Sequence, residues 1–501
     1  MPTVPMKTLT IGGTTLKIVD GDMRMSIVTP EMFGAVGNGL TDDTQAMQDA
    51  FEAAQHVVLD GSKTYYCAGT LVILDGTTLD MNGATIAGPD TADGLWQIFN
   101  FYEDDVYTGY SGNGNITIRN GRFLRSTISF IHGKDTVIEN CRFEDARRSH
   151  FIEICASQNF IVRDCSFKGM TLNYTPAQAE YINIDNAIQS HFPHAPETSP
   201  MFDGTPNDGI LIDNCVFDRN STTMWDAVGK HARYSAEYPT LNRAKDITIR
   251  NCTVYGATEE AFLFRGAEDV TIENCKAYNS AALYWVQNCD DVKICNNHIA
   301  EQTGVNRVRD CNRVMINGNY VKVNASTWDV QLQYTCSYID YSGNYFVNTY
   351  NYRLPVSLMD GATITEFSAV GNVYRVNGGH NGVLAHPAND SGCTITFGMV
   401  DDIHFVEAQN EFTATYPIFD LTNFNRMIIQ VGAVPYYTLS TVVISALQES
   451  SSSHFQVGDK FWIPVNDLST GQVGLCSIEI TDAHTLTSTG QKIRWVQLQN
   501  V

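Results

Sequence analysis

A short pattern of apolar and polar positions recurs along residues 137–277. In each copy, alternating β-branched residues are followed by Asn or Asp, then by Cys, and usually by an apolar residue two positions further on. This alternation predicts strands, and the Asn or Asp suits a bend in the left-handed conformation. Each copy is therefore expected to form a strand, a bend and a second strand. The cysteines of the five copies are Cys141, Cys165, Cys215, Cys252 and Cys275.

The repeat continues on both sides with a different residue at the Cys position, and its commonest spacing is 20–28 residues. Such a repeat cannot bury its apolar face alone, so copies must stack. We therefore predict an all-β parallel β-helix of about ten coils, with equivalent positions roughly 4.8 Å apart. A β-sandwich is the alternative, but it does not explain a fixed phrase. The further positions are Gly83, Gly121, Asn297, Asn319, Asn344 and Asn372.

Other patterns mark the parts that flank these coils. Residues 1–28 hold two alternating segments around Gly12 and predict a hairpin that attaches to something larger. An amphipathic helix over 41–55, capped by Thr41, would cover the open first coil of a β-helix that spans 29–400. The repeat disappears in 401–501, which we expect to be an all-β module for trimerisation or glycan contact.

Composition narrows the possible partners. The formal net charge of -23 argues against nucleic acid and anionic membranes, which attract basic surfaces. The 13 cysteines include no CxxC pair, so we interpret them as buried free thiols. No stretch predicts a membrane span, and the first residues do not resemble a signal peptide. We expect no cofactor and no metal; a zinc site from His191, His194 and His231 is a weak alternative.

Long insertions and two outward rows of side chains indicate where chemistry could occur. The insertions, rich in aromatic residues, are expected as loops at 87–113, 168–179, 186–207 and 232–244, where they could wall a sugar-binding groove. Alternation turns Ile152, Ile182 and Phe262 inward. The outward rows then read Glu153, Asn183, Gly229, Leu263 and Trp285, and beside them Cys155, Asp185, His231, Arg265 and Gln287.

Two reactions fit these rows. Glu153 and Asp185 would lie on the order of 8 Å apart, which suits an inverting glycoside hydrolase. Alternatively, His231 could act as the base of a polysaccharide lyase while Arg265 neutralises a uronate. We predict Glu153, Asp185 and His231 as catalytic residues. The predicted substrate-binding residues are Arg265, Asn183, Trp285, Glu180 and Gln287.

The segment from Phe33 to Ala54, followed by the Asn-Cys coils, resembles the pectate-lyase-like β-helix superfamily. Within it, residues 29–400 are most similar to tail-spike or tail-appendage proteins of bacteriophages and prophages. Glu180-Tyr-Ile-Asn-Ile-Asp185, Phe202 to Pro206 and Gly229-Lys-His231 also resemble a pattern of phage β-helices. The superfamily contains lyases, hydrolases, epimerases and binders, so the resemblance does not name a reaction.

The resemblance implies a right-handed helix and a virion protein. It implies a homotrimer, made in the host cytoplasm, that joins a phage tail or baseplate through its N-terminus. The expected partner is a bacterial surface polysaccharide of a capsule, O-antigen or cell wall, cut most simply by hydrolysis. A non-catalytic receptor-binding spike, a lyase in the same groove, and a released bacterial polysaccharide enzyme are the alternatives.

Overall fold

The computed structural model describes residues 27–91, 98–172, 179–188, 199–231, 242–325, 327–350, 355–359 and 361–376, with isolated strands before and after them. The predicted N-terminal hairpin is present, because β1 (Lys7–Ile11) pairs antiparallel with β2 (Thr14–Ile18). The chain divides into two compact units, residues 1–268 and 269–501, which are described separately below. No helix among the described residues is both long and apolar enough to span a membrane.

The predicted amphipathic helix is present but shorter than expected. After η1 (Pro30–Phe33) and β3 (Asn38–Asp42), α1 covers Thr44–Ala53. Met47, Ala50 and Phe51 are fully buried, as the pattern predicts. Thr41 is not the cap, because it belongs to β3, and the helix begins after Asp43 instead. The Asp43 carboxylate accepts hydrogen bonds from the backbone N–H groups of Val36 and Gly37, so it fixes the preceding turn.

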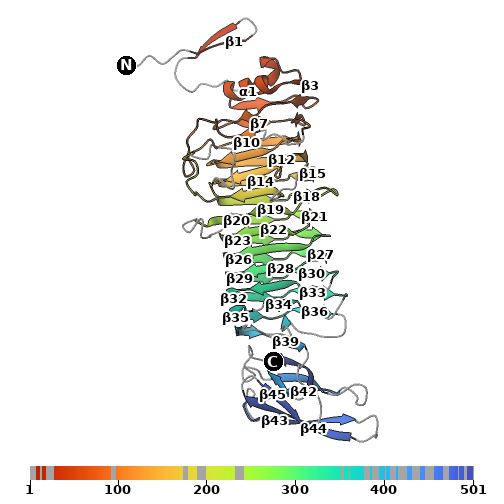
Figure 1. Cartoon of the computed structure of the whole chain (residues 1–501). Helices are drawn as coiled ribbons and strands as arrows, with labels where there is room; N and C mark the ends of the chain where they lie inside the picture. Colours follow the sequence, from red (N-terminus) through yellow and green to blue (C-terminus); the bar gives the residue numbers. More distant parts are fainter. Residues whose placement is uncertain are drawn as a thin grey trace. The chain divides into compact units, whose positions relative to one another are not determined.

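The first unit is a stack of coils, each contributing one strand to a sheet that we call sheet 1 (Figure 1). Parallel pairing joins each strand to the equivalent strand of the next coil. The remaining strands of each coil form the other faces. Sheet 1 of this unit contains β6 (Leu71–Val72), β9 (Ile98–Phe99), β11 (Ile128–Ile131), β13 (Ile152–Cys155), β16 (Glu180–Asp185), β19 (Asp226–Lys230) and β22 (Glu260–Arg265). The other faces contain β4 (His56–Val58), β5 (Thr64–Tyr66), β7 (Thr78–Asp80), β8 (Thr85–Ala87), β10 (Thr117–Leu124), β12 (Lys134–Ala146), β14 (Gln158–Arg163), β15 (Ser166–Met170), β17 (Asp208–Asp213), β18 (Val216–Asp218), β20 (Ala244–Arg250) and β21 (Thr253–Tyr255). The strand β23 (Ala267–Glu273) runs across the boundary between the units.

The second unit repeats this coil and ends in antiparallel sheets. Its sheet 1 strands are β25 (Ala282–Gln287), β28 (Asn306–Arg309), β31 (Val330–Gln333), β34 (Val356–Leu358) and β37 (Leu384–Ala385). Its other coil strands are β24 (Lys276–Tyr278), β26 (Asp290–Cys295), β27 (His298–Gln302), β29 (Asn312–Asn317), β30 (Tyr320–Val323), β32 (Thr335–Ser342), β33 (Tyr345–Asn348), β35 (Thr363–Ala369), β36 (Val373–Val376) and β38 (Thr394–Val400). One four-stranded antiparallel sheet consists of β39 (Asp402–Val406), β46 (Ile493–Gln499), β41 (Arg426–Val431) and β42 (Ser440–Ser445). The other consists of β40 (Thr413–Thr415), β45 (Thr485–Thr489), β44 (Val473–Asp482) and β43 (Lys460–Asn466).

The ladder predicted from the repeat is confirmed. The residue before each ladder Cys has a positive φ, for example 50° at Asn140 and 56° at Asp164. The Sγ atoms of Cys165 and Cys215 each lie 3.7 Å from a backbone oxygen of the preceding coil. Among the described residues, sheet 1 has seven strands in the first unit and five in the second, which is slightly more than the ten coils expected. The last of them, β37, follows Asn372, the last position of the repeat.

Candidate active site

Sheet 1 of the first unit carries the predicted outward rows in the predicted register. Cys155 pairs with Asp185, Glu153 with Asn183, Asn183 with Gly229, and Gly229 with Leu263. The inward residues Ile152, Ile182 and Phe262 are fully buried. The rows that should face solvent are buried as well, with Glu153 2% and Asp185 0% exposed. The candidate site is therefore a covered polar cluster.

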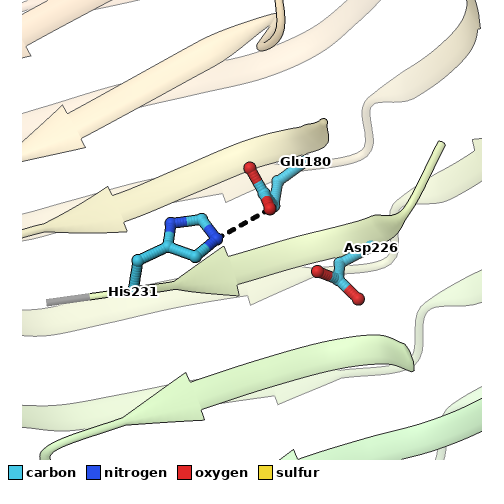
Figure 2. A group of neighbouring side chains, drawn as sticks. All are labelled: Glu180, Asp226 and His231. Atoms are coloured by element: carbon cyan, nitrogen blue, oxygen red, sulfur yellow. Dashed lines mark hydrogen bonds and ion pairs between the residues drawn. The ribbon is translucent and has the colours of Figure 1, made fainter. Parts of the chain in front are cut away.

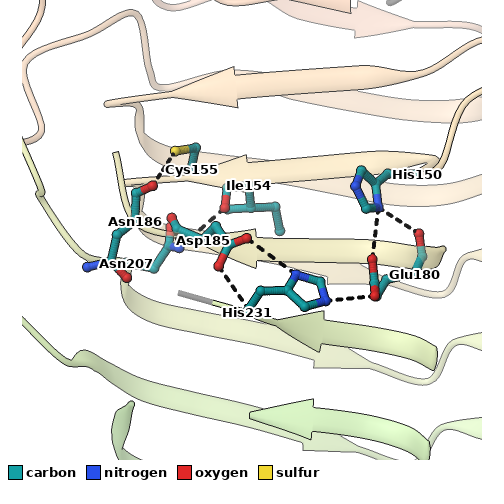
Figure 3. A network of polar contacts seen from close by, with 8 residues as sticks. All are labelled: His150, Ile154, Cys155, Glu180, Asp185, Asn186, Asn207 and His231. Carbon is teal, nitrogen blue, oxygen red and sulfur yellow. Dashed lines mark hydrogen bonds and ion pairs between the residues drawn. The ribbon is translucent and has the colours of Figure 1, made fainter. Parts of the chain in front are cut away.

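His231 is the centre of this cluster and lies just after β19. Its Nε2 is 2.7 Å from Oε1 of Glu180, and its Nδ1 is 3.5 Å from Oδ2 of Asp185. The His231 backbone N–H also donates to Oδ1 of Asp185 at 3.0 Å. Figure 3 shows the imidazole held between the two carboxylates, with His150 beyond Glu180. The sequence predicts the contact of Asp185 with His231, but it does not predict the Glu180 bond.

Gly229 makes the Glu180–His231 bond possible. A Cβ atom added at Gly229 would lie 2.4 Å from Cγ of Glu180. The Glu180 side chain therefore passes over Gly229 to reach the imidazole on the next coil. The glycine in Gly229-Lys-His231 is required for this space, since its φ is not in the positive range that favours glycine.

A column of ionisable side chains at the start of the sheet 1 strands was missed by sequence reasoning as a set. By strand register, His150, Glu180, Asp226 and Glu260 occupy equivalent positions on four successive coils. All four are buried, and the backbone N–H of Glu260 donates to Oδ1 of Asp226 at 3.0 Å. The coil alignment could have identified this column. Simple alternation leaves the direction of Glu180 uncertain and assigns Asp226 to the inward face, so the sequence alone does not bring both together with His231.

Burial and close charges separate the pKa values of these groups. Burial opposes charge on His231, but Glu180 and Asp185 outweigh it and raise the pKa of His231 to about 10. Burial likewise opposes charge on Glu180, yet His231 and His150 hold its pKa below the ordinary value. Burial, together with Glu180 and Glu260, raises the pKa of Asp226 well above the ordinary value. At neutral pH the cluster thus contains an ion pair, Glu180 with His231, beside a carboxyl group, Asp226, whose surroundings favour its protonated form.

Glu180, Asp226 and His231 are also the described residues that could hold a metal ion. Each offers one ligand atom, and these atoms lie within 4.8 Å of one another. Figure 2 shows the three side chains converging from β16, β19 and the residue after β19. The donor set suits a divalent cation, but the His231 Nε2 and the Glu180 Oε1 already bond to each other. In this structure the imidazole is thus paired with a carboxylate, and an ion would have to replace that bond to use both atoms.

The remaining predicted site residues have different surroundings. The Glu153 carboxylate accepts a hydrogen bond from Ser129 Oγ at 2.7 Å. Asn183 is buried, and Arg265 is half-buried at the end of β22. Trp285 and Gln287 lie on β25 of the second unit. His191 and His194, from the weak zinc alternative, lie outside the described residues.

Several aromatic rings of the long loops pack against a buried cluster, whereas Tyr102 stays 38% exposed. Phe99, Phe101 and Tyr107 contact a buried cluster that includes Cys155 and Met201. Hydrogen bonds between backbone and side-chain groups join this loop to the later insertion. Gly109 N–H donates to Asp203 at 2.9 Å, and Tyr110 hydroxyl donates to Pro206 O at 3.0 Å. His132 bridges the same segments through the carbonyl oxygens of Gly109 and Met201.

Asn207 links these covering segments to the site strands. Its side-chain amide donates to the backbone oxygens of Asp185 at 2.8 Å and Ile154 at 3.2 Å. Its Oδ1 accepts the backbone N–H of Ser157 at 2.7 Å. Cys155 Sγ contacts the carbonyl oxygen of Asn186 at 3.2 Å (Figure 3). Asn207 therefore ties the backbone of Asp185 to the strand of the preceding coil.

Comparison with known proteins agrees with this fold. Residues 240–398 match the family described as the right handed beta helix region. The coils of this chain form a right-handed parallel β-helix. It is 26% identical over 272 residues to plasmin and fibronectin-binding protein A of Streptococcus pneumoniae, covering 47% of this chain and 36% of that protein. It is 24% identical over 277 residues to a capsule-specific depolymerase of Klebsiella phage K64-1, covering 41% and 36% respectively.

A solved structure extends the likeness over nearly the whole chain. The tailspike protein of Escherichia coli bacteriophage HK620 superposes with a TM-score of 0.53 at 11% identity, covering 92% of this chain and 90% of that one. The predicted likeness to pectate-lyase-like β-helix proteins of the tailspike and depolymerase type is confirmed. The chain spans about a third of the length of the two curated relatives, 36% of each.

Proposed function

We propose that this protein is a tailspike-type receptor-binding protein that binds a bacterial surface polysaccharide and cleaves it by glycosidic hydrolysis. The observation that carries the proposal is the buried ion pair of Glu180 and His231 beside Asp185 on the outer face of sheet 1. Ionisable groups with strongly separated pKa values in one cluster are typical of catalytic sites. Depolymerases and tailspikes among the similar proteins support a polysaccharide as the substrate class.

Hydrolysis is favoured over lyase chemistry by the protonation of His231. A base must be unprotonated at the working pH, and a pKa of about 10 leaves little neutral imidazole at pH 7. The two carboxyl groups of Asp185 and Glu153 then act as the base and the acid. Glu180 and His231 are proposed as positioning residues, because the imidazole lies between the two carboxylates, with Nε2 2.7 Å from Glu180 Oε1 and Nδ1 3.5 Å from Asp185 Oδ2. Arg265, Asn183, Trp285 and Gln287 are proposed to contact the substrate, as the sequence rows suggest.

The test uses polysaccharide extracts from a panel of encapsulated and O-antigen-bearing bacteria. We expect new reducing ends without the absorbance of unsaturated uronates. Asp185→Asn should lower turnover by roughly 100-fold or more, the usual contribution of a general acid or base, while binding is kept. Asp213→Asn is the matched control, because Asp213 pairs with Arg250 on another face of the coil. Unchanged turnover in Asp185→Asn would exclude this residue from the reaction.

A receptor-binding protein without turnover is the second candidate. It is favoured by the burial of the two proposed carboxyl groups, which limits access of a glycosidic bond. It also agrees with the likeness to a streptococcal protein named for binding. Retention of a polysaccharide by the protein, with no reducing ends released over hours, would support this candidate against the enzyme.

We also propose a homotrimer in a virion tail, attached to the tail or baseplate through residues 1–28 and made in the host cytoplasm. The likeness to tailspikes supports this assembly. Light scattering should then give three times the chain mass of 55.5 kDa. A mass equal to one chain would contradict it.

A further inference from the structure

The second unit carries a row of polar and aromatic side chains on the outer face of sheet 1. Val286, Val308 and Leu332 are fully buried on the inner face of β25, β28 and β31. Their neighbours alternate to the outer face, where strand register aligns Trp285 with Arg307 and Gln331, and Gln287 with Arg309 and Gln333. We call these six residues the arginine face.

Aromatic rings hold the two guanidinium groups of this face. The Cζ of Arg307 lies 4.8 Å from the ring centre of Trp285, and that of Arg309 lies 4.3 Å from the ring centre of Tyr334. A guanidinium stacked on a ring keeps its edge N–H groups available for bidentate bonding to a carboxylate. The two arginines are two residues apart on one strand, which corresponds to roughly 7 Å.

The remaining groups of the face suit hydroxyls. Gln333 Nε2 donates to Gln331 Oε1 at 2.8 Å, so each side-chain amide fixes the orientation of the other. Gln287 Oε1 is buried and accepts no hydrogen bond among the described residues. Gln287 therefore offers an acceptor that the contacts of the described residues leave unused. Arg309 is partly neutralised by Asp310, whose Oδ2 lies 3.6 Å from Nε, yet 28% of the Arg309 side chain stays exposed.

We propose that the arginine face binds a carboxylate-bearing sugar, such as a uronic acid residue of the polysaccharide. This inference deepens the proposed function, because it assigns an acidic class to the glycan. The overall charge makes a local cationic site necessary for such binding. A chain with a net charge of -23 repels an acidic polymer in general. Binding such a polymer needs a local pair of fixed cations, and this face supplies one. Amides beside the arginines favour a hydroxyl-rich sugar over a simple anion.

The test measures binding of two defined probes by calorimetry, a galacturonic acid tetrasaccharide and a hyaluronan tetrasaccharide. Each is compared with its carboxyl-reduced form, which keeps the ring hydroxyls. We expect the full chain to bind at least one acidic probe at least tenfold more tightly than its reduced form. Arg307→Gln with Arg309→Gln should remove that preference. Arg313→Gln is the matched control. Arg313 of β29 forms an ion pair with Asp291 of β26, away from the arginine face.

The melting temperature of each variant shows whether it is folded. Absence of acidic binding at millimolar concentration, or equal binding by the double variant and the native chain, would overturn the inference. This outcome is separable from failure of the proposed function. Cleavage of a polysaccharide that does not depend on Arg307 and Arg309 keeps the function and removes the inference. Arginine-dependent binding of uronates without any cleavage keeps the inference and removes the proposed hydrolysis.

Discussion

At the scale of single residues, the absence of a side chain at one position determines the site. Gly229→Ala should displace Glu180, because the added methyl would lie 2.4 Å from its Cγ. We expect loss of the Glu180–His231 bond and a cost of about 1–3 kcal/mol in stability, the usual effect of overpacking. An NMR titration of His231 checks this, because its pKa should no longer be raised in the variant. Gly69→Ala is the control, since its methyl would meet only the Thr44 side chain, at 3.0 Å or more. A His231 titration unchanged in Gly229→Ala would contradict the argument.

Protonation makes the stability of the first unit pH-dependent. The raised pKa of His231 gives a contribution that is complete below its ordinary value of 6.5 and lost as pH rises through about 10. The pKa of Asp226 is also raised, so its protonated form favours the fold below 3.8, and this is lost as pH rises toward the folded value. The lowered pKa of Glu180 acts oppositely, since its contribution is lost only as pH falls below 4.5. Stability should therefore decline from weakly acidic to alkaline pH.

Asp226→Asn tests the sign of this dependence. Asn mimics the protonated carboxyl and can still accept the backbone N–H of Glu260. We expect a melting temperature close to that of the native chain at pH 4, and one that is higher by a few degrees at pH 8, at about 2–4 °C per kcal/mol. Asp213→Asn removes a half-buried ion pair with Arg250 on another face of the coil and should not show this crossover. A variant less stable than the native chain at pH 8 would show that Asp226 is ionised in the folded protein.

At the scale of elements, the second unit depends on a ladder of stacked amides. Asn319 Nδ2 donates to Ile294 O at 2.9 Å, and Asn319 Oδ1 accepts the backbone N–H of Asn297 at 2.9 Å. Asn319→Leu would leave these two buried backbone groups without a partner, at about 1–3 kcal/mol each. Urea unfolding followed by fluorescence should show a loss of about 2–6 kcal/mol. Asn317→Leu removes only a side-chain bond of 3.4 Å and should cost far less. Similar losses in both variants would refute a role for the ladder.

The ladder could be predicted from sequence because it repeats. One Asn-Cys phrase, copied at a steady spacing, fixes which residues stack, and the left-handed bends at Asn140 and Asp164 follow from it. The same alignment of the coils predicts that Asp185 and His231 lie next to each other in one row. The direction of Glu180 could not be predicted in this way. Tyr181 packs in the interior against Phe151, with ring centres 5.0 Å apart, so alternation fails where β16 begins and Glu180 turns outward.

Burial of the site also depends on contacts that sequence patterns do not contain. The insertion residues Phe101 and Met201 are distant in sequence, and each looks like part of a tolerant surface loop. Their packing on Cys155 converts an expected open row into a covered one. The coil register determines which residues are neighbours, whereas the loops determine which of those residues reach solvent.

At the scale of the whole molecule, net charge opposes folding at neutral pH. The chain has 55 acidic and 32 basic side chains, so repulsion among the excess carboxylates outweighs exposed ion pairs such as that of Arg163 with Glu139, each worth about 0–1 kcal/mol. Salt screens both the repulsion and the ion pairs. The larger of these two contributions decides whether the melting temperature rises or falls with salt. At pH 7 we expect the melting temperature to rise between 10 and 150 mM sodium chloride, roughly the range over which the screening length falls from 30 to 8 Å. Near the isoelectric pH of 4.8 this rise should vanish, which is the internal control. A fall in melting temperature with salt at pH 7 would mean that the ion pairs dominate and that the charge excess is spread too widely to destabilise the fold.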